Sequence, residues 1–247
     1  MKPYPQPLWF ISVGHLLGLA CIVLGLWAVA VGIASPLWLL LWPVAHVFNS
    51  LMLSVGLHRY FAHRSFKTSP FWHKVMAYWS ILLMNGSPLG WATAHIAHHA
   101  HSDTDLDPHL AVPSYLVWKR YRDVPMPVKL VRKWLKDKHV VRAHRHGTIL
   151  WLLFAVVLVA ISWKLFVFGY GMALGSVHLI GGLHQVLSHK DGQARNLPWL
   201  EWVFPAMGEW MHKDHHNRGG KKMGNRWWHL DVGCWFIRLI ERRVEHR

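Results

Sequence analysis

Four long stretches without a charged residue constrain the fold of this chain more than any other feature. They cover residues 8–34, 37–57, 148–163 and 165–187. Runs of about 20 apolar residues are long enough to cross a bilayer, and a helix satisfies its own backbone polar groups in lipid. The first run is too long for a signal peptide, and the second follows it almost at once. The sequence therefore predicts an all-α integral membrane protein with four transmembrane helices.

Basic residues lie almost entirely on one side of these four spans. Segments 58–147 and 188–247 carry 14 and 11 of the 27 Lys and Arg residues, whereas Lys164 alone is assigned to the far side. The connections at Ser35-Pro36 and near Lys164 are short hairpins. Since positive charge near span ends favours the cytoplasm, we expect both termini and both long segments to be cytoplasmic. The protein would then be a multi-pass membrane protein with a cytoplasmic helical cap that carries the active site.

Shorter features complete the expected architecture. Segment 71–91 is apolar with polar breaks, and we expect an interfacial or partly buried helix there rather than a fifth span. Gly14-x3-Gly18 and Gly171-x3-Gly175 are typical of close helix packing in membranes. The length suits a single membrane domain, residues 1–247. The net charge of +15 is excluded from the apolar runs, which favours a membrane over nucleic acid as the partner.

Three packets of histidine lie beside the apolar stretches. His-x-x-His-His occurs twice, and it places positions i, i+3 and i+4 on one helix face, so each set is expected to converge on one point. His58 and His63 are five apart, about 140° around an ideal helix, which suits one imidazole reaching each of two metals. Eight imidazoles exceed the four ligands of one zinc ion. The expected ligands are His58, His63, His95, His98, His99, His212, His215 and His216.

The donor set favours two transition metals held by nitrogen, because neutral imidazole suits iron, copper, zinc and nickel. Soluble di-iron bundles use Glu with paired Glu-x-x-His motifs. The chain has four Glu, and Glu209-x-x-His212 alone fits that spacing, so a carboxylate-bridged site of that type is excluded. We expect Glu209, Asp103 and Asp107 to accept hydrogen bonds from ligand imidazoles, or the two Asp to cap a helix. A ninth ligand should come from the fourth span, where His184 and His189 are candidates.

Together these motifs resemble the membrane fatty acyl desaturases of the stearoyl-CoA (Δ9) type. The resemblance runs from about residue 44 to residue 239, and its matching stretches are 56–65, 91–99, 103–109, 208–216 and 227–231. It implies that the eight packet histidines bind two Fe. It also implies that, with O2 as co-substrate, the enzyme introduces a cis Δ9 double bond into a saturated acyl chain in unsaturated fatty acid biosynthesis.

The resemblance also bears on the ninth ligand and on the substrate. The family histidine that closes span four corresponds to His184, although Ile180 stands where the family has Asn. Gln185 could replace that Asn, or His189 could be the ligand. Trp91 is expected to line the acyl tunnel. Thr93 and Ala94 stand where acyl-CoA enzymes have Arg and Asp, so acyl-CoA, acyl carrier protein and glycerolipid all stay open as the acyl carrier.

Electrons must come from outside, because the chain has no flavin or dinucleotide fingerprint and no Cys set for an iron–sulfur cluster. By family analogy the donor is cytochrome b5 or a ferredoxin. The basic stretch 119–145 suits an acidic protein or lipid headgroups. A fatty-acid or alkane hydroxylase of the same histidine-rich group is the alternative enzyme. A metal transporter is less favoured, because transporters place their ligands near the midplane and these packets lie beyond the span ends.

Overall fold

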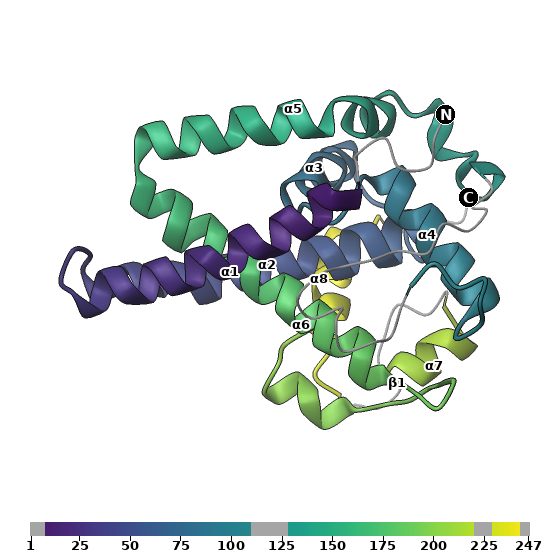
Figure 1. The fold of residues 1–247 in the computed structure, drawn as a ribbon. Helices are drawn as coiled ribbons and strands as arrows, with labels where there is room; N and C mark the ends of the chain where they lie inside the picture. The colour runs from purple at the N-terminus through teal and green to yellow at the C-terminus, as the bar shows by residue number, and fades with distance from the viewer. Residues whose placement is uncertain (1–7, 110–127, 220–228, 243–247) are drawn as a thin grey trace.

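The computed structural model describes residues 8–109, 128–219 and 229–242, and these are mostly helical (Figure 1). Four helical segments are long and apolar enough to cross a membrane: Phe10–Ala30, Pro36–Ala62, Lys138–Ile161 and Leu165–Ser188. The prediction of an all-α integral membrane protein with four spans is confirmed. Figure 1 shows the turns within the two pairs of spans at one end of the molecule, here called the turn end. Helices α4 and α7 and strand β1 lie at the opposite end, here called the histidine end.

The spans are built from seven elements. The first pair comprises α1 (Leu8–Ala30), then the 3-10 helix η1 (Pro36–Leu40), α2 (Leu41–Leu51) and the π-helix η2 (Met52–Ala62). The second pair comprises α5 (Lys138–Ile161), the π-helix η6 (Leu165–Gly171) and α6 (Met172–Ser188). The third span begins about ten residues before the predicted position. Asp137 explains this, because its carboxylate accepts from the N–H groups of His139 and Val140 at 2.9 and 3.1 Å and caps the helix.

Spans one and four pack through glycine. Gly18 and Gly175 approach so closely that a Cβ atom on either residue would overlap the backbone of the other helix. The other glycine of each motif faces a side chain instead: Gly14 meets Met84, and Gly171 meets Cys21. Both motifs therefore make the close contacts that their spacing predicts.

The remaining elements are short and lie toward the histidine end. They are α3 (Pro70–Leu82), α4 (Pro88–His101), η4 (Val128–Val131), η5 (Trp134–Lys136), β1 (His189–Lys190), β2 (Gln193–Ala194), η7 (Pro198–Trp202), α7 (His212–Asn217) and α8 (Val232–Ile240). Strands β1 and β2 are antiparallel, with His189 opposite Ala194. At 13 residues α3 is too short to span a bilayer, which agrees with the expectation for segment 71–91.

The outer faces of the spans expose large apolar side chains. On α5, Val156 is 65% exposed and Ile161 is 67% exposed, and on α2 Val44 is 70% exposed. In water such a surface would drive association. In a bilayer the same side chains are solvated by acyl chains, so these faces mark where lipid contacts the protein.

The core below the histidine end holds η2 in place. Leu57 and Phe61 of η2 are fully buried together with Met76 of α3. The indole N–H of Trp134 donates to the Phe61 carbonyl at 2.8 Å, so a buried aromatic residue also satisfies the backbone of the π-helix. A rigid η2 matters because it carries the first histidine pair.

Candidate metal centre

The first histidine pair lies on η2, and the π-helical backbone decides where both rings point. The N–H of His63 donates to the His58 carbonyl at 3.0 Å, an i→i+5 hydrogen bond. This bond brings residues five apart onto the same side of the helix, and the two ring centroids lie 4.9 Å apart. The expectation that each imidazole reaches a different metal is therefore wrong, because it assumed an ideal α-helix.

The two His-x-x-His-His packets lie on α4 and α7, and each packet is divided. His95 and His99 of α4 lie in one cluster, whereas His98 lies in another. Helix α7 repeats this division, with His215 as the residue at i+3. Positions i+3 and i+4 point about 100° apart around a helix, so one packet serves two neighbouring centres. The expectation that all three rings of a packet meet at one point is wrong for this reason.

Two clusters result, each of which could hold a metal ion. Within each cluster, one candidate ligand atom from every residue lies within 4.8 Å of all the others. The five-histidine cluster consists of His58, His63, His95, His99 and His215, and the four-histidine cluster consists of His98, His189, His212 and His216. The eight packet histidines are thus all brought together, and both clusters offer imidazole donors alone.

The spacing of the Nε2 atoms fits metal coordination. His99 Nε2 lies 3.0 Å from His95 Nε2 and 2.8 Å from His215 Nε2. A neutral ring has one N–H, so nitrogens that face one another in such a set cannot all pair by hydrogen bonds. Bonds of about 2.1 Å to a shared cation place adjacent nitrogens about 3 Å apart. The Nε2 atom of His98 is buried without a hydrogen-bond partner in the described part of the chain, and a metal ion would coordinate its lone pair.

Carboxylates hold the far nitrogens of three of these rings. His98 Nδ1 lies 2.9 Å from Asp107, and His189 Nδ1 lies 3.0 Å from Asp103. Each Nδ1–H donates to its carboxylate and leaves the Nε2 lone pair facing the cluster. Burial alone would raise the pKa of Asp107, but its hydrogen bond with His98 and the charge of that ring hold the pKa below its ordinary value.

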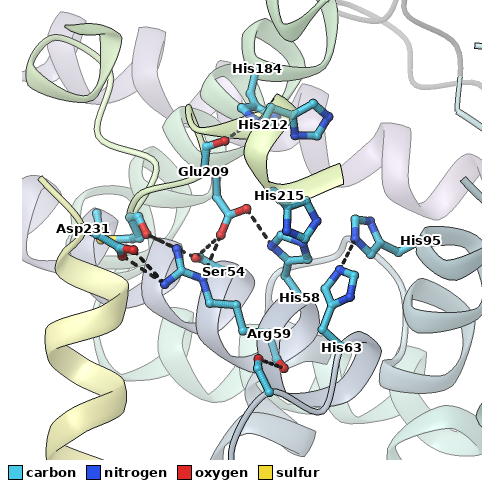
Figure 2. A network of polar contacts seen from close by, with 12 residues as sticks. Ser54, His58, Arg59, His63, His95, His184, Glu209, His212, His215 and Asp231 are labelled. Carbon is cyan, nitrogen blue, oxygen red and sulfur yellow. Dashed lines mark hydrogen bonds and ion pairs between the residues drawn. The ribbon is translucent and has the colours of Figure 1, made fainter. Parts of the chain in front are cut away.

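Glu209 holds the third ring, and Figure 2 shows it between His58 and Arg59. Its Oε2 lies 2.6 Å from His58 Nδ1, its Oε1 lies 3.4 Å from Arg59 Nε, and it also accepts from the Ser54 hydroxyl. Burial would raise the pKa of Glu209, but His58 and Arg59 hold it well below its ordinary value. Arg59 in turn pairs with Asp231 at 3.0 Å. Sequence reasoning missed the role of Arg59; its position next to His58, at the end of an apolar span, was the available signal.

The structure places His189 in the four-histidine cluster and His184 beside it. His189 Nε2 lies 2.7 Å from His212 Nε2. His184 Nε2 instead lies 2.9 Å from the backbone carbonyl of Glu209, which accepts its hydrogen bond. The sequence favoured His184 as the ninth ligand, whereas the structure groups His189, and not His184, with the four-histidine cluster. The reason is that α6 ends at Ser188 and the chain turns into β1, which carries His189 toward α7.

Five cluster imidazoles outside the spans have lowered pKa values, which favour the neutral form that metals bind. Burial and the neighbouring His58 lower the pKa of His63 to about 3. Burial, followed by the charge of His98, lowers the pKa of His216 to about 3. Burial is also the first cause that holds the pKa values of His95, His212 and His215 well below their ordinary range. At neutral pH each of these rings is uncharged, so one of its two nitrogens has a free lone pair.

A cavity of about 120 Å³ lies against both clusters. His58 and His95 line it from one cluster, and His98 and His212 line it from the other. Leu53, Val177, Ile180, Pro205 and Ala206 provide apolar wall, and Ser50, Asn85 and Gln185 provide polar wall. A substrate group in this cavity would therefore lie next to both candidate metal positions.

Trp91 lines the cavity, as expected of a substrate-contacting residue, and its ring stacks on His95 at 4.7 Å. Gln185 also lines it, but it makes no contact with a cluster imidazole that the structure records. Its Nε2 atom is buried without a hydrogen-bond partner in the described ranges. Thr93 and Ala94 are each 1% exposed inside α4, so neither side chain faces a surface where a soluble carrier could dock.

Two adjacent all-histidine clusters with a cavity against both, in a helical membrane protein, are the architecture expected of a membrane-bound metalloenzyme. No protein-family model matches the chain. Over 219 residues the chain is 30% identical to the sn-2 palmitoyl-lipid 9-desaturase of Nostoc sp. (strain 36), covering 79% of this chain and 75% of that relative. It is 28% identical over 229 residues to Delta-9 acyl-lipid desaturase 2 of Arabidopsis thaliana, covering 83% and 72%. It is also 25% identical over 254 residues to the hex-5-enoyl-[acyl-carrier protein] acetylenase of Moorena producens (strain JHB), covering 87% and 75%.

The chain belongs to the membrane fatty acyl desaturase family. It is accordingly an oxidoreductase that desaturates fatty acyl chains. The sequence resemblance to this family is thus confirmed by relatives that cover most of the chain.

Proposed function

We propose that this enzyme uses two iron ions and O2 to introduce a cis double bond at the Δ9 position of an acyl chain carried by a membrane glycerolipid. The observation that carries the proposal is the cavity that both histidine clusters line. A methylene group lying there would be within reach of either centre. In this proposal all nine clustered histidines are ligands, with His189 as the ninth.

Iron is proposed because of what the substrate demands. An unactivated methylene has no acidic proton and no leaving group, so a redox-active centre must remove its hydrogens, and bound iron supplies that oxidising power from O2. The balanced reaction is R–CH2–CH2–R′ + O2 + 2 e⁻ + 2 H⁺ → R–CH=CH–R′ + 2 H2O. Zinc would fit the same nitrogens but is redox-inert, so it would give a folded but inactive protein.

The chain's own residues position the reactants. Leu53, Val177 and Ile180 give the cavity apolar surface, which binds an alkyl chain and displaces water. Trp91 stacks on His95 and lies 5.8 Å from the His58 ring, between ring centroids, so it restricts the alkyl chain next to the five-histidine cluster. Asp103, Asp107 and Glu209 fix the orientation of three ligand rings, which sets the geometry of both centres.

A glycerolipid is proposed as the carrier for two reasons. Two relatives have names that specify lipid-linked acyl chains. In addition, Thr93 and Ala94 are buried in α4, where they offer no charge to a coenzyme A headgroup. The name of a third relative specifies acyl carrier protein, so the carrier is an outcome that the assay must report.

The electron donor is proposed to be a separate acidic protein of the cytochrome b5 or ferredoxin type. Lysines and arginines precede and begin α5, and those with exposed side chains in the described residues are Lys129, Arg132, Lys133, Lys136, Lys138, Arg142 and Arg145. Such a surface would attract an acidic partner over distance. The earlier part of the predicted basic stretch, residues 119–127, lies outside the described residues. The same charge bias supports a cytoplasmic histidine end, with the chain as one domain.

Expression in a host that lacks its own desaturase tests this function. Gas chromatography–mass spectrometry of the host lipids should show a new cis-Δ9 monoene, and separation of lipid classes should locate it in glycerolipids. His98→Ala, which removes a ligand, should abolish the product. His101→Ala, which removes an exposed histidine of the same helix, should retain it. A hydroxylated fatty acid as the only product would reject desaturation in favour of the related hydroxylases.

A further inference from the structure

Residues 197–210 leave the histidine end, run alongside the spans and return. The two ends of this segment, here called the 197–210 loop, are joined because the N–H of Leu197 donates to the Trp210 carbonyl at 2.8 Å. Helix η7 forms the outgoing arm. Figure 1 shows this light green segment nearer to the turn end than α7 or β1.

The tip of the loop reaches deep along the second span. The ring of His46 on α2 donates from Nε2 to the Pro205 carbonyl at 3.3 Å. His46 is ten residues from Pro36, the start of that span, and a rise of about 1.5 Å per residue places it about 15 Å from the turn end. Its Nδ1 lies 2.8 Å from the Ser176 hydroxyl at the middle of the fourth span. A bilayer core is about 30 Å thick, so Pro205 lies near the depth of its centre.

The returning arm, residues 206–210, runs back toward the histidine end along the same span. The Met207 carbonyl accepts from Arg59 Nη2 at 2.8 Å, and Glu209 meets His58 at 2.6 Å. Pro205 thus contacts residue 46 of the span, whereas Met207 contacts residues 54 and 59 and Glu209 contacts residue 58, so the returning arm lies nearer the histidine end than the tip does. A segment that enters and leaves on the same side of a span is a re-entrant loop.

Several backbone polar groups at the turn of the loop are satisfied within the protein, which a hydrocarbon environment favours. The N–H groups of Val203 and Phe204 donate to the Leu200 carbonyl at 3.1 and 2.7 Å. The Phe204 carbonyl accepts from the Trp210 indole at 2.7 Å. The Pro205 carbonyl accepts from His46, and the Met207 carbonyl accepts from Arg59. The turn itself contains Met207 and Gly208 with positive φ, and Gly208 has no room for a Cβ atom beside Asp231.

The outer surface of the loop is apolar and uncharged. Trp199, Trp202 and Val203 are 63, 71 and 61% exposed. The single titratable side chain between Pro198 and Gly208 is Glu201, which is 3% exposed and accepts from the Ala206 N–H at 2.8 Å. Burial raises the pKa of Glu201 to about 7, so this inward-pointing group is partly protonated near neutral pH. Two exposed indoles without a neighbouring charge suit the acyl and interfacial region of a lipid leaflet.

We propose that the 197–210 loop is embedded in the leaflet on the histidine side, with Trp199, Trp202 and Val203 against lipid acyl chains. The partner is the acyl region of the bilayer, because this surface continues the lipid-facing side of α2, where Val44 and Val47 are 70 and 40% exposed beside His46. Pro205 and Ala206 also line the cavity, so the loop separates the cavity from lipid. If the protein has the function proposed above, an acyl chain from the bilayer would pass this loop to enter the cavity; that consequence rests on the proposed function.

Site-specific fluorescence in lipid vesicles tests the placement. Cys21 and Cys234, the buried free thiols of the described chain, are replaced by Ala. An environment-sensitive label is then attached at Trp199→Cys, Trp202→Cys or Val203→Cys, one position per protein. Val156→Cys on the lipid-facing side of α5 is the membrane control, and Lys190→Cys on exposed β1 is the aqueous control. Each label is challenged with iodide and with phosphatidylcholine that carries a nitroxide in mid-chain.

The loop labels should be quenched by the nitroxide lipid as at Val156 and protected from iodide. Iodide quenching equal to that at Lys190 at all three positions, without lipid quenching, would overturn the proposal. Three positions keep the test decisive if one variant does not fold, and Trp202→Phe, which keeps the apolar ring, should retain full metal content and activity. Absence of a desaturated product from the unsubstituted protein, with lipid quenching intact, would refute the proposed function and leave the loop placement supported.

Discussion

Substitution of His189 by Ala should remove one metal ion from the protein and leave the other. The four-histidine cluster would keep three nitrogens, from His98, His212 and His216. Loss of a hydrogen-bond partner of a ligand typically costs about 10–100-fold in metal affinity, and loss of the ligand itself should cost at least the upper end of that range. A factor of about 100 corresponds to about 2.8 kcal/mol of binding free energy. The five-histidine cluster contains no atom of His189, so its ion should be retained.

Metal content after dialysis against a graded chelator measures this difference. The unsubstituted protein should hold two ions per chain, and His189→Ala should hold one. His184→Ala is the matched control, because His184 donates to the Glu209 carbonyl and lies in neither cluster. It should hold two ions. Two ions retained by His189→Ala, together with one lost by His184→Ala, would refute the assignment and restore the choice that the sequence favoured.

Three further substitutions probe the site and its surroundings. Glu209→Gln should weaken metal binding in the five-histidine cluster by about 10–100-fold, measured by chelator competition, because His58 loses its anionic partner; unchanged affinity would mean that Glu209 does not act through His58. Ala206→Trp should fill the cavity wall and lower kcat/KM for the acyl substrate by about 100-fold with metal content unchanged, and an unaltered kcat/KM would show that the chain binds elsewhere. Glu201 has a pKa raised from 4.5 to about 7 in the folded protein, so the stability gained by protonation is present below pH 4.5 and is lost as pH rises through 7. Glu201→Gln should remove that decline in thermal unfolding scans, and a decline that persists would contradict its assignment to Glu201.

The sequence was informative about which histidines matter and less so about how they are divided. Apolar runs predicted the four spans, since only helices of that length and composition satisfy their backbone in lipid. The packets at 95–99 and 212–216 predicted two helices that each present several imidazole rings to a metal site. The angle of about 100° between positions i+3 and i+4 allows each packet to be divided, but which of its residues joins which cluster depends on how α4 and α7 face each other. The pairing of His58 with His63 depends on a π-helix, which an ideal α-helical projection misses.

Tertiary contacts decided the remaining features. His189 lies past the end of α6, and its place in the four-histidine cluster depends on the turn into β1 and on Asp103, 86 residues earlier in the chain. In the sequence Arg59 is recognisable only as a charge at the end of a span, whereas its contacts with Glu209 and Asp231 join it to residues 150 and 172 positions later in the chain. The 197–210 loop has too few apolar residues to be read as a span. Its depth follows only from the contacts of Pro205 and Met207 with the second span.

The most direct test of the central claim is the stoichiometry of products from purified, iron-loaded protein in lipid vesicles with a chemical or protein reductant. The claim is that two histidine-bound irons act on an acyl chain held in the cavity. It predicts one cis-monoene for each O2 and each pair of electrons consumed, with activity that follows the occupancy of both clusters. Full activity with a single iron per chain, or hydroxylated fatty acid as the sole product, would contradict it.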